Sequence, residues 1–496
     1  MSDLVLAIDQ GTTGSTIALM DAEGRLLTSV NHEFPQIFPK PGWVEHDPES
    51  IWESVEKGLA AIFADGTYAV ADVSAIGITN QRETAVLWDA ETGKAVHNAI
   101  VWQCRRTTDV CEQLKAEGHE ALIKARSGLV LDPYFSATKF KWLLDNAAGA
   151  KTLLDQGRLR AGTIDSYLIW RLSAGQAHKT DVSNASRTSL MALDSLSWDD
   201  ELLSIFGVPK AILPEICPSS GRFAVTRGVA GLPDGIPISG VAGDQQSALF
   251  GQACFSVGDA KCTFGTGSFI LMNAGDVPVA SDSGLLSTVA WQLEGQSAVY
   301  ALEGGAFVCG AAVQWLRDQL GIIQSAADVE ALAQTVEDAG GVEFVPALAG
   351  LGAPYWAPEA RGTLTGLTRG SGRGEIARAT LDAMALQNAD ILNAMEKDIG
   401  SSMQSLKVDG GASANNFLMQ LQADYLARPI TRPEVIETTV AGACFLAGLG
   451  EGVWSSPDEV TNVWRSDRSF EVAMDDAARA ARFESWQSAV AKTLLS

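Results

Sequence analysis

The sequence lacks the long apolar runs and leader signals that would place a chain in or across a membrane. No stretch approaches the roughly 18 uninterrupted apolar residues that a transmembrane helix requires. The chain starts with Met1, Ser2 and Asp3, and its first apolar run extends only to Ile8, which is too short and too acidic for a signal peptide. We therefore expect no membrane insertion and a cytoplasmic location.

Basic residues and paired cysteines are also scarce. The chain has 36 Lys and Arg against 60 Asp and Glu, a formal net charge of −24, so its surface repels nucleic-acid phosphates and anionic lipid headgroups. Its seven cysteines are scattered and odd in number, and no CxxC pair occurs among them. We expect the cysteines to be reduced thiols that form neither a zinc site nor a redox-active pair. The composition thus argues against DNA, RNA and membrane partners.

Common phosphate-binding signatures are missing too. The sequence contains neither a P-loop pattern, GxxxxGKS or GxxxxGKT, nor a GxGxxG that follows a strand and opens a helix. The H-R-D and D-F-G elements of protein kinases are absent as well. A nucleotide site in this chain must therefore use another kind of turn.

The sequence does contain the alternating pattern of an α/β protein. Its 496 residues exceed the size at which one hydrophobic core stops growing, which predicts two domains. Apolar runs of strand length occur at residues 4–8, 75–78, 236–241 and 406–408. Apolar residues recur every three or four positions, as in helices, at residues 48–63, 306–320, 376–398 and 415–425.

Two glycine-threonine segments of similar sequence suggest two related lobes. Residues 10–20, QGTTGSTIALM, resemble residues 264–272, FGTGSFILM, if two single-residue gaps are allowed. Each segment predicts a hairpin with a Gly-Thr turn, although a gapped match this short can also arise by chance. We place the boundary near residues 250–255, which divides the chain into an N-terminal lobe, residues 1–252, and a C-terminal lobe, residues 253–496.

Both turns have the composition of a phosphate cradle. In the first turn Gly11 and Gly14 let the backbone approach an anion closely, and neighbouring threonines add hydroxyl groups. Asp9 ends the preceding strand, where its carboxylate can orient magnesium through water. One such turn alone is more often an ordinary hairpin. With a second turn at Thr266, the two Gly-Thr turns could bind one triphosphate from both lobes.

Two further patterns fit a nucleotide, and each also has an ordinary structural explanation. Residues 408–416 lead a strand through two glycines into a helix start, where a flat base can lie against the backbone. By itself this pattern is a common transition from a strand to a helix. Gly310 and Gln314 share one helix face, which suits a ribose and phosphate edge but equally suits helix packing through a small residue.

Polar residues follow two of the predicted strands. Arg82 and Glu83 come after the strand at residues 75–78, and Asp244 and Gln245 come after the strand at residues 236–241. In open α/β sheets the carboxyl ends of the strands face the ligand crevice, which favours a binding role for these residues. Without that placement, Arg82 and Glu83 would be interpreted as a surface ion pair.

Several long segments carry a family resemblance along nearly the whole chain. They are residues 39–48 (PKPGWVEHDP), 77–83, 98–106, 238–246 and 350–356. Through them the chain resembles the FGGY carbohydrate kinases of the actin-like ATPase superfamily, in particular members that phosphorylate glycerol. The resemblance implies an α/β fold of two actin-like, ribonuclease H-like lobes with a ligand cleft between them. It also implies ATP and Mg²⁺ as cofactors, sn-glycerol 3-phosphate as product, and a homodimer or homotetramer.

The same resemblance implies roles for individual residues. The polyol would be bound by Arg82, Glu83, Tyr134, Asp244 and Gln245, with Trp102 and Phe269 against its carbon face. Nucleotide contacts would come from Thr12, Thr13, Gly14, Thr266, Gly310, Gln314, Gly411 and Asn415. Asp244 would act as general base on the terminal hydroxyl, and Asp9 would lie near the metal. For Trp102 and Tyr134 alone, core packing would be the default interpretation.

The chain departs from the family pattern at two places. Thr16 stands where relatives often carry an arginine near the phosphates, which would weaken phosphate or product contacts without changing the reaction. Residues 226–235 lack the Gly-Gly-Thr-Arg pattern that some relatives use for fructose 1,6-bisphosphate, and they hold no histidine for activation by phosphotransfer. We therefore expect neither form of control.

Two alternative functions stay open. An FGGY kinase for another polyol or sugar, such as erythritol or xylulose, would share the nucleotide residues. Arg82, Glu83, Trp102 and Tyr134 together favour glycerol, because a longer sugar would need less aromatic bulk. A non-catalytic, ATP-gated binding module is the second alternative, and it would not need the base at Asp244.

Overall fold

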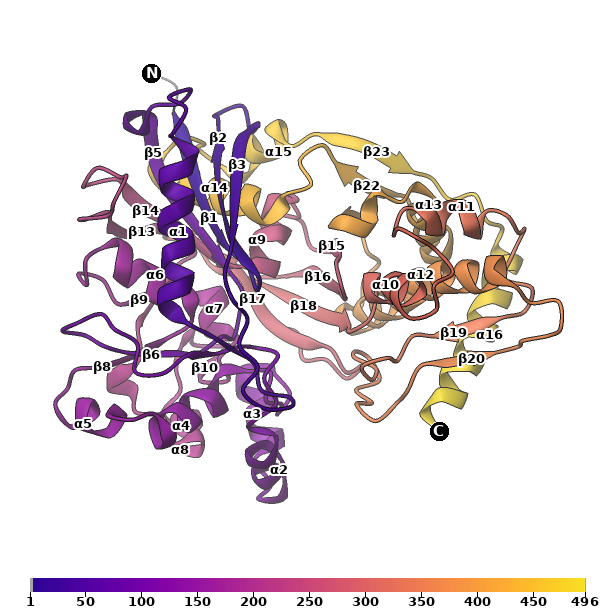
Figure 1. Cartoon of the computed structure of the whole chain (residues 1–496), viewed down its shortest axis with the longest axis horizontal. Coiled ribbons are helices and arrows are strands. Elements are labelled where there is room, and N and C mark those ends of the chain that lie inside the picture. The colour runs from indigo at the N-terminus through magenta and orange to yellow at the C-terminus, as the bar shows by residue number, and fades with distance from the viewer. Residues whose placement is uncertain (1–2, 496) are drawn as a thin grey trace.

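The computed structural model describes residues 3–495 and shows two lobes, each built around one large mixed β-sheet (Figure 1). Met1, Ser2 and Ser496, with which the predicted lobes begin and end, lie outside the described residues. Helices cover the sheets in both lobes, so the predicted α/β class is confirmed.

The sheet of the N-terminal lobe combines a hairpin with parallel strands. Its spatial order is β13 (Ser220–Val225), β14 (Pro237–Gly243), β5 (Val73–Asn80), β1 (Leu4–Gln10), β2 (Gly14–Met20) and β3 (Leu26–Glu33). β1, β5 and β14 are parallel, whereas β2 runs antiparallel to both β1 and β3. The Gly11 N–H donates to the Gly14 carbonyl at 2.9 Å, which closes the first predicted hairpin.

The sheet of the C-terminal lobe repeats this topology. Its order is β17 (Leu286–Gln292), β18 (Ala298–Ala306), β16 (Ser268–Gly275), β15 (Asp259–Phe264), β21 (Ser405–Asp409), β22 (Ile430–Pro433) and β23 (Ser466–Phe470). β15, β21 and β22 are parallel, and β16 runs antiparallel between β15 and β18. The order β18-β16-β15-β21-β22 therefore matches β3-β2-β1-β5-β14, so the short sequence echo corresponds to a repeated fold.

Shorter elements surround the two sheets. Two-stranded pairs are formed by β4 (Glu45–His46) with β7 (Ala99–Ile100), β6 (Val86–Asp89) with β8 (Leu159–Gly162), β9 (Lys179–Asp181) with β12 (Glu215–Cys217), β10 (Met191–Ala192) with β11 (Ser197–Trp198), and β19 (Glu343–Val345) with β20 (Thr363–Thr365). The helices are α1 (Pro48–Ile62), α2 (Thr108–Ala116), α3 (Glu120–Ser127), α4 (Ser136–Asn146), α5 (Ala150–Asp155), α6 (Ile164–Leu172), α7 (Val182–Ser186), α8 (Asp200–Phe206), α9 (Asp244–Gly251), α10 (Gly310–Asp318), α11 (Asp328–Ala333), α12 (Arg373–Ile399), α13 (Asn416–Leu426), α14 (Thr438–Glu451), α15 (Pro457–Val463) and α16 (Asp476–Leu494).

The first sheet is buried on both faces, which explains the continuous apolar run of β1. Successive side chains of a strand point to opposite faces. Leu6 and Ile8 pack in the core that contains α1 and α6, whereas Val5 and Ala7 pack in the core that contains α9 and α14. This second core also holds residues of the other sheet, such as Leu271, so α9 and α14 lie between the two sheets.

Helix α14 approaches its neighbours very closely because glycines line the contact. A Cβ atom added to Gly77 of β5 would lie 2.1 Å from the carbonyl oxygen of Ala443 in α14. One added to Gly442 of α14 would lie 1.8 Å from the carbonyl oxygen of Ser247 in α9. Helix α14 belongs to the part of the chain after residue 252, but it packs on the sheet of the N-terminal lobe. The predicted lobe boundary near residue 252 therefore stays a prediction.

Most of the predicted helices match the structure, and one is wrong at its start. The patterns at residues 48–63, 376–398 and 415–425 correspond to α1, α12 and α13. The pattern at residues 306–320 does not begin as a helix, because Ala306 is the last residue of β18 and pairs with Ser268. Helix α10 begins only at Gly310. Apolar residues of the strand continue into those of the helix, so periodicity alone did not separate them.

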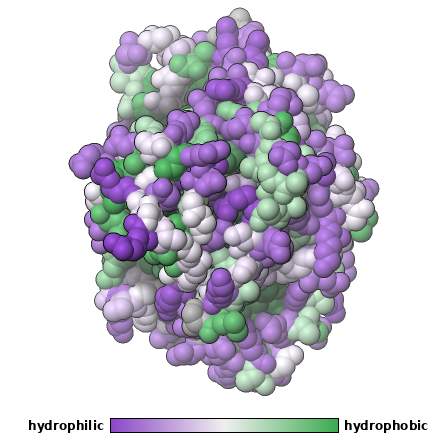
Figure 2. Space-filling model, turned by 90° about the vertical axis from the view of Figure 1, so that its right-hand side faces the viewer, coloured by the Kyte–Doolittle hydropathy of each residue, from purple (hydrophilic) through white to green (hydrophobic). Residues whose placement is uncertain are grey.

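The largest core belongs to the C-terminal lobe, where the 27-residue α12 packs with α10, α13 and α16 against the second sheet. Hydrophilic side chains cover most of the face of this lobe shown in Figure 2, and the hydrophobic ones are scattered. Among residues 3–495, no helix has both the length and the apolar character needed to cross a bilayer.

Candidate active site

The site begins at the carboxyl ends of two adjacent parallel strands, β5 and β14. Arg82 and Glu83 follow β5, and Asp244 and Gln245 form the first turn of α9 directly after β14. The pairing of the strands places these residues together, with Arg82 Nε 3.2 Å from Asp244 Oδ1. The polar segments that the sequence places after two strands therefore meet at one point.

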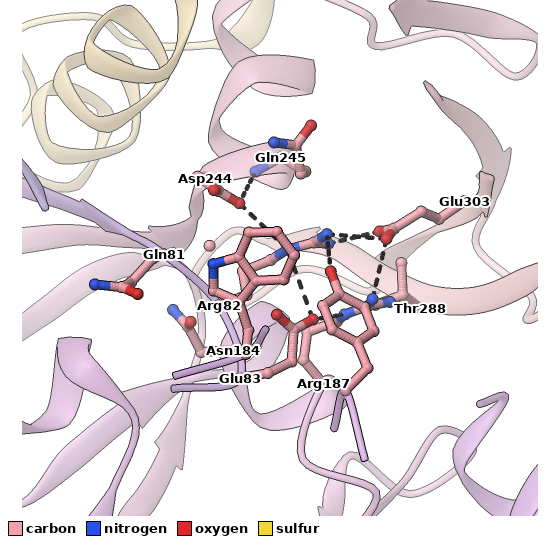
Figure 3. Close-up of polar contacts among 12 residues, drawn as sticks. Gln81, Arg82, Glu83, Asn184, Arg187, Asp244, Gln245, Thr288 and Glu303 are labelled. Atoms are coloured by element: carbon pink, nitrogen blue, oxygen red, sulfur yellow. Dashed lines mark hydrogen bonds and ion pairs between the residues drawn. The ribbon is translucent and has the colours of Figure 1, made fainter. Parts of the chain in front are cut away.

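Two residues that the sequence analysis missed complete a buried cluster of charges around Arg82 (Figure 3). Glu303 of β18 receives hydrogen bonds from Arg82 Nη1 at 2.5 Å and Nη2 at 2.9 Å. Arg187 donates from Nε to Glu83 Oε1 at 2.7 Å and from Nη2 to Glu303 Oε1 at 3.0 Å. Since β18 belongs to the second sheet, the cluster joins the two lobes.

The charges of this cluster stabilise one another in a dry environment. Burial opposes ionisation of Glu303, but the guanidinium groups of Arg187 and Arg82 outweigh it and lower the pKa of this carboxyl to about 2. Burial raises the pKa of Glu83 and of Asp244, and nearby cations only partly offset it. Asp244 is thus a carboxylate whose proton affinity is increased, as a general base requires.

The backbone is strained at Glu83. Its φ is +60°, in the left-handed region that residues with a Cβ atom rarely adopt. The Ser136 hydroxyl donates to the Glu83 carbonyl at 3.0 Å, and Arg187 holds the side chain. Strained residues held by many contacts are typical of functional sites.

Aromatic side chains form one wall of the site. Trp102 and Tyr134 are both half-buried and contact edge to face, with ring centroids 5.7 Å apart. Arg82 Nη2 donates to the Tyr134 hydroxyl at 3.3 Å. Trp102 Nε1 donates to Thr12 Oγ1 at 3.1 Å, which connects this wall to the first Gly-Thr turn.

A third missed residue, Lys261 of β15, reaches the site from the second sheet. Its buried ammonium group donates to the Gln245 side-chain oxygen, to Thr263 Oγ1 at 2.9 Å and to the Phe269 carbonyl at 3.3 Å. Burial lowers the pKa of this lysine. Lys261 and Glu303 are charged residues inside otherwise buried strands, a pattern that could have identified them. Arg187 lacks such a signal in the sequence.

The second Gly-Thr turn packs against the start of α10. The Gly265 N–H donates to the Gly267 carbonyl at 2.9 Å, which closes the second predicted hairpin. The Thr266 carbonyl accepts from Cys309 N–H at 2.8 Å, and the Gly310 N–H donates to the Gly265 carbonyl at 3.0 Å. A Cβ atom at Gly310 would lie 2.7 Å from that carbonyl oxygen. The structure therefore brings Thr266 and Gly310 together.

The remaining residues assigned to the nucleotide are less closely connected. Thr13 and Gly411 are exposed, and Gly411 lies in the short 3₁₀ turn Gly411–Ala414 after β21. Gln314 is exposed on α10, and Asn415 caps α13 by accepting from Leu418 N–H at 2.8 Å. Among the described residues, no hydrogen bond joins Gln314 or Asn415 to either Gly-Thr turn.

Asp9 lies where the first sheet meets the start of α14. Its carboxylate accepts from the Thr439 hydroxyl at 2.7 Å, while the adjacent Thr438 donates to Asp409 of the second sheet, also at 2.7 Å. Burial and the charges of Asp244 and Glu437 raise the pKa of Asp9 to about 7. A carboxylate crowded by other carboxylates suits a hard cation with oxygen ligands.

The residues around Asp9 cannot enclose a metal ion by themselves. Within residues 3–495, no group of three or more His, Cys, Asp or Glu side chains is arranged to hold one. In general, Mg²⁺ keeps several waters and is commonly bound by one or two carboxylates together with substrate phosphates. Thr16, where relatives often have arginine, is tied to β3 because its hydroxyl accepts from Asn31 at 2.9 Å.

Comparison with known proteins agrees with this fold. The models of the N-terminal and C-terminal domains of the FGGY family of carbohydrate kinases match residues 4–251 and 260–451. A glycerol kinase of Bdellovibrio bacteriovorus is 58% identical over 490 residues, 99% of each chain. One of Symbiobacterium thermophilum is 55% identical over 486 residues, covering 98% of this chain and 97% of that protein.

Comparison with solved structures shows the same fold. The structure of Plasmodium falciparum glycerol kinase with ADP has a TM-score of 0.93 and 36% identity, and the match covers 99% of this chain and 98% of the other. Gluconate kinase from Lactobacillus acidophilus has a TM-score of 0.89 at 22% identity over the same shares of the two chains, which supports the fold alone. From its domains, its relatives and its structure, this chain belongs to the FGGY family of carbohydrate kinases.

Proposed function

We propose that this chain is an ATP-dependent glycerol kinase, which converts ATP and glycerol to ADP and sn-glycerol 3-phosphate. The observation that carries the proposal is the meeting of Arg82, Glu83 and Asp244 beside the aromatic pair Trp102 and Tyr134. Trp102 in turn touches the first Gly-Thr turn through its ring N–H. Similarity to glycerol kinases over nearly the whole chain supports the same substrate.

Each polyol residue offers a chemistry suited to a small triol. The guanidinium of Arg82 supplies fixed donors, and the carboxylates of Glu83 and Asp244 accept hydroxyl protons. Trp102, Tyr134 and Phe269 would cover the carbon face and limit the size of the substrate. Lys261, by holding the side-chain oxygen of Gln245, would turn the amide N–H groups toward the ligand.

The two Gly-Thr turns and the C-terminal lobe would hold ATP. Backbone N–H groups and hydroxyls of Thr12, Thr13, Gly14 and Thr266 would bind phosphate oxygens. The nucleoside would lie along Gly310, Gln314, Gly411 and Asn415. The direct contact between the Thr266 turn and Gly310 supports one continuous site for phosphates and nucleoside.

Magnesium would lie near Asp9, which would hold it through water. When bound, Mg²⁺ would neutralise charge on the ATP phosphates and help to orient the γ-phosphoryl group. The pKa of Asp9 is raised first by burial and then by the charges of Asp244 and Glu437, and this neighbouring negative charge supports a cation at this position.

Asp244 would take the proton of the terminal glycerol hydroxyl as the oxygen attacks the γ-phosphorus. Arg82 would hold the hydroxyls so that the attacking oxygen lies in line with the leaving ADP. The two lobes, which we divide at residue 252, would close around both substrates and exclude water that competes with glycerol. A cytoplasmic homodimer or homotetramer remains part of the proposal, and light scattering would test the assembly.

A coupled ADP-release assay tests the substrate directly. Purified protein with ATP and Mg²⁺ would be given glycerol, dihydroxyacetone, erythritol, xylulose or water alone. We expect the highest kcat/KM for glycerol. Release of no more ADP with glycerol than with water would refute the proposed function, whereas preference for erythritol or xylulose would favour another FGGY kinase.

A further inference from the structure

Arg187 and Glu303 are two deeply buried charged residues next to the proposed polyol site. The side chain of Arg187 is 0% exposed and that of Glu303 is 3% exposed, so neither presents its charge to solvent. Each nevertheless makes a short bond to a residue that we propose to bind hydroxyls. A buried charge is costly unless a partner compensates it, which suggests that these contacts have a specific role.

Glu303 fixes the plane of the Arg82 guanidinium. Its two carboxylate oxygens accept from both Nη atoms of Arg82, at 2.5 and 2.9 Å, a two-pronged pairing that sets direction as well as distance. The other partners of Arg82 are farther away: Asp244 at 3.2 Å, Gln246 at 3.2 Å, Tyr134 at 3.3 Å and Glu83 at 3.8 Å. These longer contacts are the ones that a substrate hydroxyl can replace, while Glu303 keeps the group in place.

Arg187 orients the carboxylate of Glu83 in a similar way. Its Nε binds Glu83 Oε1 at 2.7 Å, and among the described residues Glu83 Oε2 takes part in no hydrogen bond. The second oxygen is thereby left to accept a hydroxyl. The backbone of Glu83 is strained, with φ at +60°, and the bond from Arg187 is one of the contacts that hold this residue in place.

We propose that Arg187 and Glu303 are positioning residues for polyol recognition, which aim Arg82 and Glu83 at the hydroxyls without touching the substrate. Glu303 stands on β18 of the second sheet, whereas Arg82, Glu83 and Arg187 belong to the N-terminal half of the chain. Recognition of the hydroxyls therefore depends on the correct approach of the two lobes. The inference rests on the proposed glycerol kinase activity and adds to it.

Glu303→Gln and Arg187→Lys separate positioning from mere stability. The first keeps the shape of the side chain but removes its charge and turns an N–H toward the guanidinium; the second keeps the charge but loses the planar fork. The readout is the ratio of kcat/KM for glycerol to that for propane-1,2-diol and for propane-1,3-diol, each of which lacks one hydroxyl. We expect the ratio to fall at least about tenfold in both variants, with the KM for ATP within about twofold of the parent.

Asp382→Asn provides a matched control. Asp382 of α12 is also buried, with a side chain 2% exposed, and it pairs with Arg378 at 3.1 Å and with the Tyr425 hydroxyl at 2.7 Å, away from the site. This variant should keep the parent selectivity, whatever the change in its melting temperature. Unchanged selectivity in Glu303→Gln and Arg187→Lys would overturn this inference but not the proposed function. A parent enzyme without activity on glycerol would overturn the proposed function and the inference with it.

Discussion

Asp244→Asn is the sharpest test of the proposed chemistry, because the structure separates the catalytic role of this residue from its structural one. Asp244 is the first residue of α9, and its Oδ1 accepts from Gln245 N–H at 2.7 Å. Asparagine keeps this oxygen and nearly the same shape. It cannot take a proton from a hydroxyl.

The expected magnitude follows from the surroundings of Asp244. A general base contributes typically about 10² to 10⁴ in rate, so kcat should fall at least about a hundredfold. The contact of Arg82 with Oδ1 at 3.2 Å loses its charge, but Arg82 keeps both oxygens of Glu303, so the KM for glycerol should change less than about tenfold. Burial raises the pKa of Asp244, which means that its charge costs stability, and the melting temperature should stay constant or rise.

Steady-state kinetics at saturating glycerol and ATP, together with thermal unfolding, would check these values. In the parent, the acidic limb of the kcat/KM profile should lie above the ordinary carboxyl pKa of 3.8, because the pKa of Asp244 is raised. Turnover of the variant within about threefold of the parent would refute the role of Asp244 and leave the mechanism without a base.

Two further predictions concern stability. Burial, then repulsion by Asp181, raises the pKa of Asp165 from 3.8 to about 7. This group alone should therefore lower the unfolding free energy by about 3 kcal/mol between about pH 5 and pH 8, in addition to the contribution of Asp9, whose pKa is also raised to about 7. Asp165→Asn should remove the contribution of Asp165 in urea titrations, and parallel pH profiles of variant and parent would contradict the argument. Gly442→Ala places a methyl group 1.8 Å from the Ser247 carbonyl oxygen. The resulting overpacking should lower the free energy of unfolding by about 1–3 kcal/mol. The control Gly370→Ala, whose nearest new contact is 3.7 Å, should melt like the parent, and equal melting of both variants would refute the close packing of α14.

The sequence predicted the local secondary structure around the candidate site well. The strand at residues 75–78 and the polar residues after it depend on an apolar run followed by Arg82 and Glu83, and both Gly-Thr hairpins depend on their own turn residues. Such features are encoded within a few residues. The prediction failed at residues 306–309, because Ala306 is still paired with Ser268 as the last residue of β18 and α10 begins only at Gly310.

Only the tertiary structure decided which distant charges meet. The sequence by itself determined the strand runs, the two Gly-Thr turns and the polar residues that follow β5 and β14, because these are local properties of the chain, and it suggested two related lobes. It gave no sign that Glu303 would pair with Arg82, 221 positions away, or that Arg187 would anchor Glu83 across 104 positions. Those partners are selected by the packing of two sheets, since a charge buried between them is stable only where an opposite charge faces it. The same packing placed α14 against the first sheet, through glycines whose importance appears only when two backbones meet.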